Sequence, residues 1–305
     1  MSDNARDLLE LFCLPALAAA MPWRFGTAFC RQRSVEHWYD DEVQAALNAA
    51  RGFLPVAHSK GEDWARRYRH GRLFDHVDLF LMQTRGERWL RRWVDVEGRW
   101  PEQGPFVVVT FHYGNGFWGI RHLRRSGFTV QAVRRGFDRA LFGPAWVRYL
   151  YARLRTRVTD RAFGLATLPD DAHSVRKLRQ ALRAGQCVLG LFDVPVEEGR
   201  KAIAAEFFGR PARFPRGLLY LARTESVPIV VYILRTDADS GRKHLRIFPP
   251  IRVDDEQRAG REVVRLLETA IREDPTAWHH WAGIARFFAG ADAAAAAAQC
   301  PTETV

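Results

Sequence analysis

Pro105-Phe-Val-Val-Val-Thr-Phe-His112 is the stretch of sequence that decides the fold. It is an unbroken apolar run rich in β-branched valine, which is typical of a strand buried on both faces of a parallel sheet. After it, segments with helical spacing alternate with further apolar, strand-like runs. This alternation predicts an α/β fold with a mostly parallel central sheet flanked by helices.

The boundaries of the expected elements come from the same patterns. Helices are expected over 40–50, within 61–90, and over 116–125, 140–155, 174–184, 216–224 and 258–272. Strands are expected over 105–112, 128–133, 187–192, 228–234 and 244–248. Residues 40–100 are therefore expected to be helical and to precede the sheet.

The composition is that of a globular protein with an excess of positive charge. The 305 residues are 47% hydrophobic, which excludes a disordered or fibrous chain. The 46 Lys+Arg against 35 Asp+Glu give a formal net charge of +11. Such an excess indicates an anionic partner, which can be nucleic acid, a phospholipid surface, or an acidic protein or cofactor.

The cysteines show no spacing that suggests cross-linking or metal binding. They are scattered as Cys13, Cys30, Cys187 and Cys300, without a C-x-x-C pair. We therefore expect no disulfide framework, no bound metal, and a reducing, cytoplasm-facing environment.

An uncharged stretch lies near the N-terminus, over residues 11–23 between Glu10 and Arg24. It is shorter than the roughly 20 residues that a membrane-spanning helix needs, and Pro15 and Pro22 interrupt it. Two interpretations remain open: an amphipathic anchor that lies in one leaflet of a membrane, and an ordinary buried helix.

The end of the first strand is where chemistry is expected, because ligands of open α/β sheets bind at the carboxyl ends of strands. One interpretation is NADP binding, since Gly114-Asn-Gly116-Phe-Trp-Gly119 matches G-x-G-x-x-G and Arg134-Arg135 end the next strand. The bulky Trp118 weakens the NADP interpretation, because it crowds the turn that should approach the pyrophosphate. The other interpretation is that His112 is a general base for acyl transfer.

Several blocks favour the second interpretation, because together they resemble the family of bacterial lipid A late acyltransferases. In chain order they are His112-Tyr-Gly-Asn115, 127–134, Leu191-Phe-Asp193, 206–212, 217–223, Pro275-Thr-Ala-Trp278 and Arg286-Phe287. The resemblance covers roughly residues 8–288. It implies a glycerophospholipid-acyltransferase-like α/β fold and no resident cofactor. It also implies acyl transfer from acyl carrier protein or CoA to a hydroxyl or amine of a lipid acceptor, at the cytoplasmic face of the inner membrane.

One departure from the family pattern affects the catalytic motif. The family's H-x4-D/E motif has an acid five positions after the histidine, where this chain has Phe117. The resemblance implies that this acid accepts a hydrogen bond from the histidine and so holds the tautomer in which the other ring nitrogen can take a proton. Asp193 is a candidate replacement, because it follows the strand 187–192 and should lie at the same sheet edge as His112. Glu197 and Glu198 are further candidates in the same loop.

Other residues are expected to bind substrate. The resemblance matches Arg134 to an arginine that meets phosphate or a developing oxyanion, and it suggests that Arg210 holds a phosphate or sugar. Asn115, with the backbone of Gly114 and Gly116, is expected to donate hydrogen bonds to the thioester carbonyl. Some aromatic side chains could line an acyl groove, although such residues are more often core: Trp118, Phe207, Phe208, Phe214 and Trp281.

These interpretations define the expected organisation of the chain. Residues 1–35 are a membrane-docking segment, 36–288 an acyltransferase domain, and 289–305 a disordered Ala-rich tail. The expected anions become membrane headgroups, lipid phosphates and an acidic carrier protein, rather than nucleic acid. The alternative is a family member without catalysis that binds lipid or acyl carrier protein.

Overall fold

A seven-stranded, mostly parallel sheet forms the centre of the molecule, with the strand order β1-β9-β8-β2-β5-β3-β4. The computed structural model describes residues 3–55, 60–134, 136, 138–169, 172–197 and 199–288. The Ala-rich tail 289–305, Arg135 and Glu198 lie outside the described residues. The predicted fold class is confirmed.

The strands of the central sheet are β1 (Val94–Glu97), β2 (Val107–Thr110), β3 (Val130–Arg134), β4 (Leu168–Pro169), β5 (Cys187–Leu191), β8 (Ile229–Thr236) and β9 (Lys243–Ile247). All neighbours pair in parallel except β8 and β9, which are antiparallel. All four residues of β2 are buried, as its β-branched sequence predicts for a central strand.

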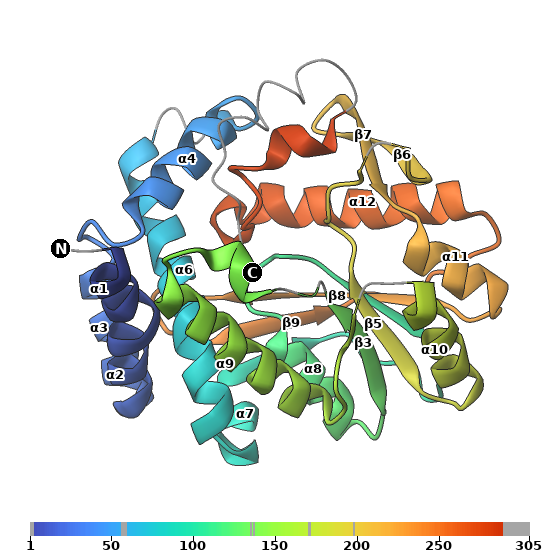
Figure 1. The fold of residues 1–305 in the computed structure, drawn as a ribbon, viewed down its shortest axis with the longest axis horizontal. Coiled ribbons are helices and arrows are strands. Elements are labelled where there is room, and N and C mark those ends of the chain that lie inside the picture. The colour runs from blue at the N-terminus through green and yellow to red at the C-terminus, as the bar shows by residue number, and fades with distance from the viewer. Residues whose placement is uncertain are drawn as a thin grey trace.

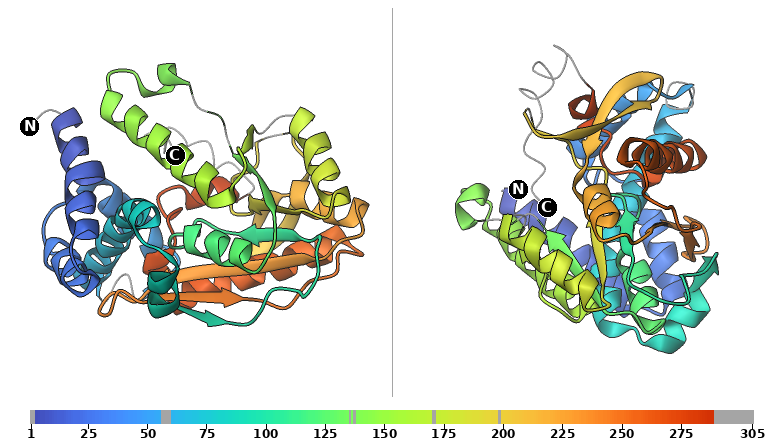
Figure 2. Two further views of the ribbon diagram at one scale, coloured as in Figure 1. Left: turned by 90° about the horizontal axis from the view of Figure 1, so that it is seen from below. Right: turned by 90° about the vertical axis from the view of Figure 1, so that its right-hand side faces the viewer.

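Helices cover both faces of this sheet. They are α1 (Asp3–Leu8), α2 (Leu14–Ala20), α3 (Trp23–Arg33), α4 (Asp40–Arg51), α6 (Gly61–Thr84), α7 (Glu87–Trp93), α8 (Phe117–Arg125), α9 (Trp146–Phe163), α10 (Ala172–Arg183), α11 (Gly217–Thr224) and α12 (Glu256–Glu273). In Figure 1, α12 lies above the sheet while α8 and α9 lie below it, and the two views of Figure 2 agree with this arrangement.

Short turns and a hairpin complete the described fold. They are the π-turn η1 (Leu9–Cys13), the 3-10 turns η2 (Arg139–Phe142), η3 (Pro275–Ala277) and η4 (Ile284–Phe287), and the antiparallel strands β6 (Ala202–Phe207) and β7 (Arg210–Pro215). The β6–β7 hairpin packs on α12.

Three expected elements need correction. The stretch Val94–Glu97, expected within the helical region, is edge strand β1, which pairs with β9. The helix expected over 140–155 is divided into η2 and α9 where Gly143 and Pro144 interrupt it. The β6–β7 hairpin was not expected, because its strands alternate buried and more exposed residues and contain no continuous apolar run.

The N-terminal helices have one buried side and some exposed apolar side chains. Ala18, Ala19 and Trp23 are buried, α2 packs on α6, and the Trp23 indole donates to the Gly241 carbonyl at 3.1 Å. On the outer side, Leu17 is 49% exposed and Phe25 is 68% exposed. Among the described helices, none is long and apolar enough to cross a membrane.

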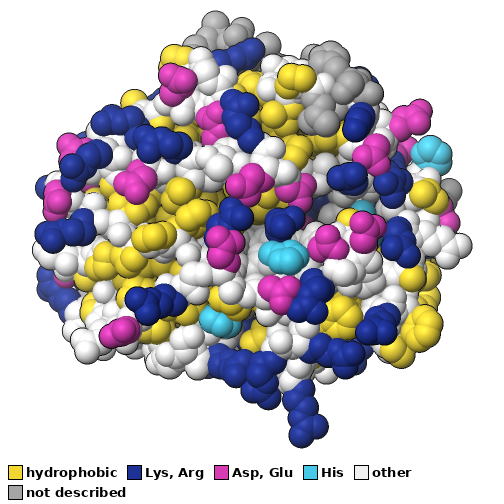
Figure 3. Space-filling view, turned by 180° about the vertical axis from the view of Figure 1, so that it is seen from behind, with side chains coloured by type: hydrophobic (Ala, Val, Ile, Leu, Met, Phe, Trp, Pro, Cys, Tyr) yellow, Lys and Arg dark blue, Asp and Glu magenta, His cyan; other side chains and the backbone are white. Residues whose placement is uncertain are grey.

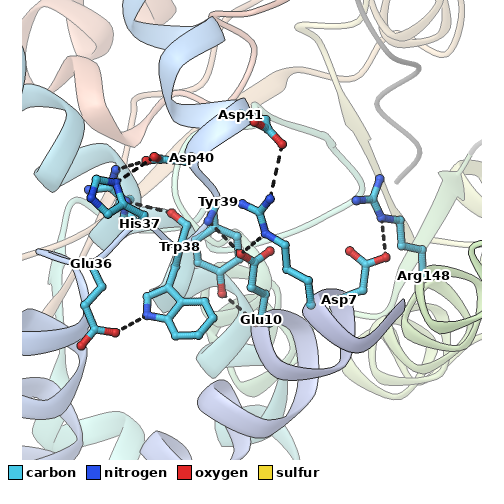
Figure 4. A network of polar contacts seen from close by, with 11 residues as sticks. Asp7, Glu10, Glu36, His37, Trp38, Tyr39, Asp40, Asp41 and Arg148 are labelled. Carbon is cyan, nitrogen blue, oxygen red and sulfur yellow. Dashed lines mark hydrogen bonds and ion pairs between the residues drawn. The ribbon is translucent and has the colours of Figure 1, made fainter. Parts of the chain in front are cut away.

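Polar contacts fix the first helix to two later segments (Figure 4). The buried Glu10 carboxylate accepts hydrogen bonds from Arg6 Nε and from the backbone N–H of Tyr39, both at 3.0 Å. The Tyr39 hydroxyl donates to the Glu10 carbonyl at 2.6 Å. Asp7 pairs with Arg148 of α9 at 2.9 Å. The N-terminal segment is therefore joined to the start of α4 and to α9.

Candidate active site

Three neighbouring parallel strands bring the predicted site residues to one edge of the sheet. In the order β2-β5-β3, His112 follows β2, Asp193 follows β5, and Arg134 ends β3. Because the strands are parallel, their carboxyl ends lie at the same edge. The structure thus brings together residues that are far apart in the sequence.

His112 and Asp193 form a directly bonded pair. Nδ1 of His112 lies 3.0 Å from Oδ1 of Asp193, and the backbone N–H of His112 donates to both carboxylate oxygens at 3.0 and 2.9 Å. The Trp278 indole donates to Oδ2 at 2.9 Å. The Asp193 side chain is fully buried, whereas that of His112 is 31% exposed. A proton on Nδ1 would leave Nε2 of His112 as the proton acceptor.

The surroundings of Asp193 favour its ionised form. Burial alone would raise its pKa, but the charge and hydrogen bond of His112, the charge of His280 and the Trp278 hydrogen bond together lower it. The carboxylate can therefore stabilise positive charge on an imidazole at neutral pH.

A segment from near the end of the described chain runs beside the His112 loop. The N–H of Gly114 donates to the Ala277 carbonyl at 2.7 Å, and that of His279 donates to the His112 carbonyl at 2.9 Å. An isolated antiparallel bridge joins Tyr113 to Trp278 between them. Residues 277–280 thereby act as a short added strand along residues 112–114.

The side chains of this segment point to three different partners. Trp278 reaches Asp193, His279 Nε2 lies 2.8 Å from Asp75 of α6, and the His280 ring lies on the ring of His112. The two imidazole centroids are 4.2 Å apart at an interplanar angle of 71°.

The buried Asp75 is also held in its ionised form. Burial would raise its pKa, but the charge and hydrogen bond of His279, followed by the charges of Arg72 and Arg155, lower it to about 2. His279 and Asp75 thus form a second histidine–aspartate pair, and the backbone N–H of His279 joins it to the carbonyl of His112.

Among the described residues, one group could hold a metal ion. His112, Asp193 and His280 each offer one ligand atom, and these atoms lie within 4.8 Å of one another. Two imidazoles and one carboxylate suit divalent transition metals. In the structure, however, His112 and Trp278 already bond the carboxylate, so the pair is complete without an ion.

Two of the expected carbonyl donors are bonded within the chain. The N–H of Gly114 is used by Ala277, and the Asn115 amide donates to the carbonyl of Asp75 at 3.1 Å. The Asn115 side-chain oxygen accepts the N–H of Phe117 at 3.1 Å, a local bond within the turn that leads into α8. Asn115 therefore orders the turn between β2 and α8.

The three glycines of the G-x-G-x-x-G match are explained by packing. A Cβ on Gly114, whose φ is +55°, would lie 2.1 Å from the carbonyl oxygen of Leu234. A Cβ on Gly119 would lie 2.3 Å from Cε2 of Tyr232, and one on Gly116 would lie 3.2 Å from its hydroxyl. The absence of a side chain at these glycines lets Leu234 and Tyr232 approach closely, which explains the pattern without a bound dinucleotide.

The residue five positions after His112 is apolar and buried. Phe117 is only 7% exposed, and the Arg155 guanidinium of α9 lies 5.4 Å from the centre of its ring. Arg134 Nε bonds Thr167 Oγ1 at 2.8 Å, so its guanidinium is anchored at the end of β3. Glu197 is exposed and pairs with Arg200.

Arg210 and the aromatic residues lie on the hairpin side. The exposed guanidinium of Arg210 stacks over Phe53 at 4.8 Å, in a cation–π contact at the start of β7. The proposed acyl-groove aromatics instead belong largely to the packed core, since four of them have 0% exposure: Trp118, Phe207, Phe214 and Trp281.

Sequence reasoning missed the partners that complete the site. Trp278, His279, His280 and Asp75 contact the predicted pair or its loop, yet none was singled out as a site residue. The adjacent histidines between Trp278 and Trp281 were a usable signal, because two titratable side chains inside an aromatic block are uncommon in a core.

The α/β fold and its histidine–aspartate pair at the sheet edge are consistent with a group-transfer enzyme, and a family comparison identifies the class as acyltransferase. The family model for bacterial lipid A biosynthesis acyltransferases matches residues 77–282, more than half of the chain. The chain belongs to that family. A comparison with curated proteins gives no match.

Proposed function

We propose that the protein transfers a fatty acyl chain from a thioester, of acyl carrier protein or CoA, to a hydroxyl or amine of a lipid acceptor. The observation that supports this most is the His112–Asp193 pair at 3.0 Å, with its carboxylate fully buried and its imidazole partly exposed. The family membership supports acyl transfer to a lipid.

In this mechanism His112 is the general base. Nε2 takes the proton of the acceptor hydroxyl, while Nδ1–H donates to Asp193, which stabilises the imidazolium that forms. The acceptor oxygen attacks the thioester carbon, and the thiol leaves with the proton from His112. No G-x-S-x-G elbow occurs in the sequence, so no serine acyl-enzyme is invoked.

Asp193 takes over the role of the acid that Phe117 replaces. A carboxylate at the end of β5 can orient the imidazole of His112 as well as one from the start of α8 could, since the two adjacent strand ends hold them together. Because the motif differs, the acceptor can be lipid A or another envelope lipid.

We further propose that the enzyme acts at the surface of the inner membrane. Exposed apolar side chains on the N-terminal helices, including Leu17 and Phe25, are suited to contact acyl chains at the bilayer interface. Arg134 and Arg210 are proposed to bind phosphate or sugar groups of the substrates, since guanidinium forms paired hydrogen bonds with phosphate.

The test is substitution of the proposed base. His112→Ala is assayed with two donors that carry a radiolabelled acyl chain, acylated acyl carrier protein and acyl-CoA. The acceptors are vesicles that contain lipid A precursor or phospholipid. We expect product formation to fall by at least about 10³-fold, because general-base catalysis and its charge stabilisation are lost together. His37→Ala is the matched control, because the His37 side chain is 90% exposed.

Turnover by His112→Ala close to that of the wild type would contradict the mechanism. If the wild-type protein binds acyl carrier protein or vesicles and forms no product, the noncatalytic alternative is supported instead.

A further inference from the structure

Three groups lie within hydrogen-bond distance of the Asp193 carboxylate. The backbone nitrogen of His112 is 3.0 and 2.9 Å from its two oxygens, Nδ1 of His112 is 3.0 Å from Oδ1, and the Trp278 indole nitrogen is 2.9 Å from Oδ2. The backbone donor is nearly equidistant from both oxygens, so it holds the carboxylate without distinguishing one oxygen from the other. The orientation of the carboxylate is therefore set by the two groups that bond a single oxygen each, one from His112 and one from Trp278.

The protein holds the indole of Trp278 firmly in place. Trp278 is fully buried, and an isolated antiparallel bridge joins it to Tyr113, the residue after His112. Its ring packs on those of Trp281 and Phe207, with centroids 5.1 and 5.8 Å apart. A donor fixed by backbone and by packing in this way can fix the group that it bonds.

The orientation of the carboxylate matters because the base depends on it. The Asp193 side chain is fully buried, so loss of the Trp278 donor would leave Oδ2 short of a hydrogen-bond partner, which is costly for a buried ionised group. The carboxylate could then turn out of line with Nδ1 of His112. The imidazole, which is 31% exposed, would lose the contact that orients it.

We infer that Trp278 is a positioning residue for the proposed acyl transfer, whose indole N–H holds Oδ2 of Asp193 so that Oδ1 faces Nδ1 of His112. The inference rests on the proposed function, because that function makes His112 the base. Trp278 acts through Asp193 and has no need to touch either substrate. Groups that orient a functional side chain from behind commonly change activity about 10- to 100-fold when they are removed.

The experiment compares Trp278→Phe with Trp281→Phe in the acyl-transfer assay. The two tryptophans are matched, because both are fully buried and each indole donates one hydrogen bond, that of Trp281 to the Pro275 carbonyl at 2.7 Å. We expect Trp278→Phe to lower kcat about 10- to 100-fold with KM within about threefold of the wild type. Trp281→Phe should keep kcat within about threefold of the wild type, although it should lose a similar amount of thermal stability.

A second measurement places Trp278→Phe in the Asp193→Asn background. If the indole acts through the carboxylate, the double variant should be no slower than Asp193→Asn alone, because the oriented carboxylate is already lost. Losses of kcat that multiply in the double variant would mean that Trp278 acts independently of Asp193, which overturns the inference.

Thermal unfolding checks that Trp278→Phe keeps the fold. If it does not, benzothienylalanine in place of Trp278 is the deciding variant, because sulfur replaces the N–H in a ring of nearly the same shape. A kcat of the folded variant equal to that of Trp281→Phe overturns the inference.

His112→Ala separates this result from failure of the proposed function. An active His112→Ala refutes the proposed base and with it the role of Trp278. An inactive His112→Ala, together with a Trp278→Phe as active as Trp281→Phe, refutes only the role of Trp278.

Discussion

At the scale of single residues, a buried carboxylate bonds a partly exposed imidazole at the edge of the sheet. Phe117, five positions after His112, is buried under Arg155. Asp193 supplies the carboxylate from the end of the neighbouring strand, where the backbone N–H of His112 and the Trp278 indole also bond it. The imidazole of His112 is thus bonded by a carboxylate from a neighbouring strand.

Asp193→Asn is expected to lower kcat by about 10³- to 10⁴-fold. The amide keeps the size of the side chain but offers an N–H to Nδ1 of His112, which favours the wrong tautomer and removes the charge that stabilises the imidazolium. Single-turnover acyl-transfer kinetics measure this loss. Glu197→Gln, in the same loop but exposed, should keep the wild-type rate. A fully active Asp193→Asn would show that this carboxylate does not support the base.

At the scale of elements, the turn between β2 and α8 is set by close packing against β8. Gly119 faces the ring of Tyr232, whose hydroxyl donates to the Gly116 carbonyl at 3.0 Å. The glycine pattern that suggests a dinucleotide site therefore reflects how closely helix and strand approach each other.

Gly119→Ala is expected to destabilise the protein by about 1–3 kcal/mol, because the new Cβ would lie 2.3 Å from the Tyr232 ring and would overpack the core. The free energy of unfolding in urea measures the change. Gly217→Ala, at the start of α11 with open space around its Cβ position, should be neutral or slightly stabilising. Equal stability of Gly119→Ala and the wild type would contradict the packing explanation.

At the scale of the whole molecule, the excess charge is distributed and is not confined to one groove. On the face drawn in Figure 3, Lys and Arg side chains lie among acidic ones and also gather along the lower edge, where α7 is located. Many are paired, as Arg216 and Arg223 are with Glu256.

A buried ion pair joins helix α6 to strand β9 of the sheet. Lys243 of β9 and Asp78 of α6 lie 2.8 Å apart with no exposure of either side chain. The Lys243 ammonium also faces the ring of Trp23 at 5.6 Å. Burial raises the pKa of Asp78 against the opposing effect of Lys243.

Lys243→Met is expected to cost about 3–5 kcal/mol, because it leaves the Asp78 carboxylate buried without its partner. The double variant Lys243→Met/Asp78→Leu should recover most of this loss, since no buried charge remains. Urea unfolding of the wild type, both single variants and the double variant gives the coupling. Additive losses in the double variant would mean that the pair is not coupled.

Much of the fold could be predicted from the sequence because its signals are local. The valine run of β2, the alternation of strands and helices, and His112 at a strand end are each visible within a short window. The hairpin β6–β7 and the edge strand β1 were not predicted, because their residues are fixed by packing on α12 and pairing with β9.

The sequence by itself determined the parallel α/β sheet, the family resemblance and the position of the proposed base, His112. Only the tertiary structure decided that Asp193, 81 residues from His112, bonds Nδ1, and that the His280 ring packs against the ring of His112. It also committed Asn115 to ordering the turn before α8, and the three glycines to close packing. The physical reason is that distant segments meet through the folding of the sheet, and such contacts leave no periodic pattern in the residues that make them.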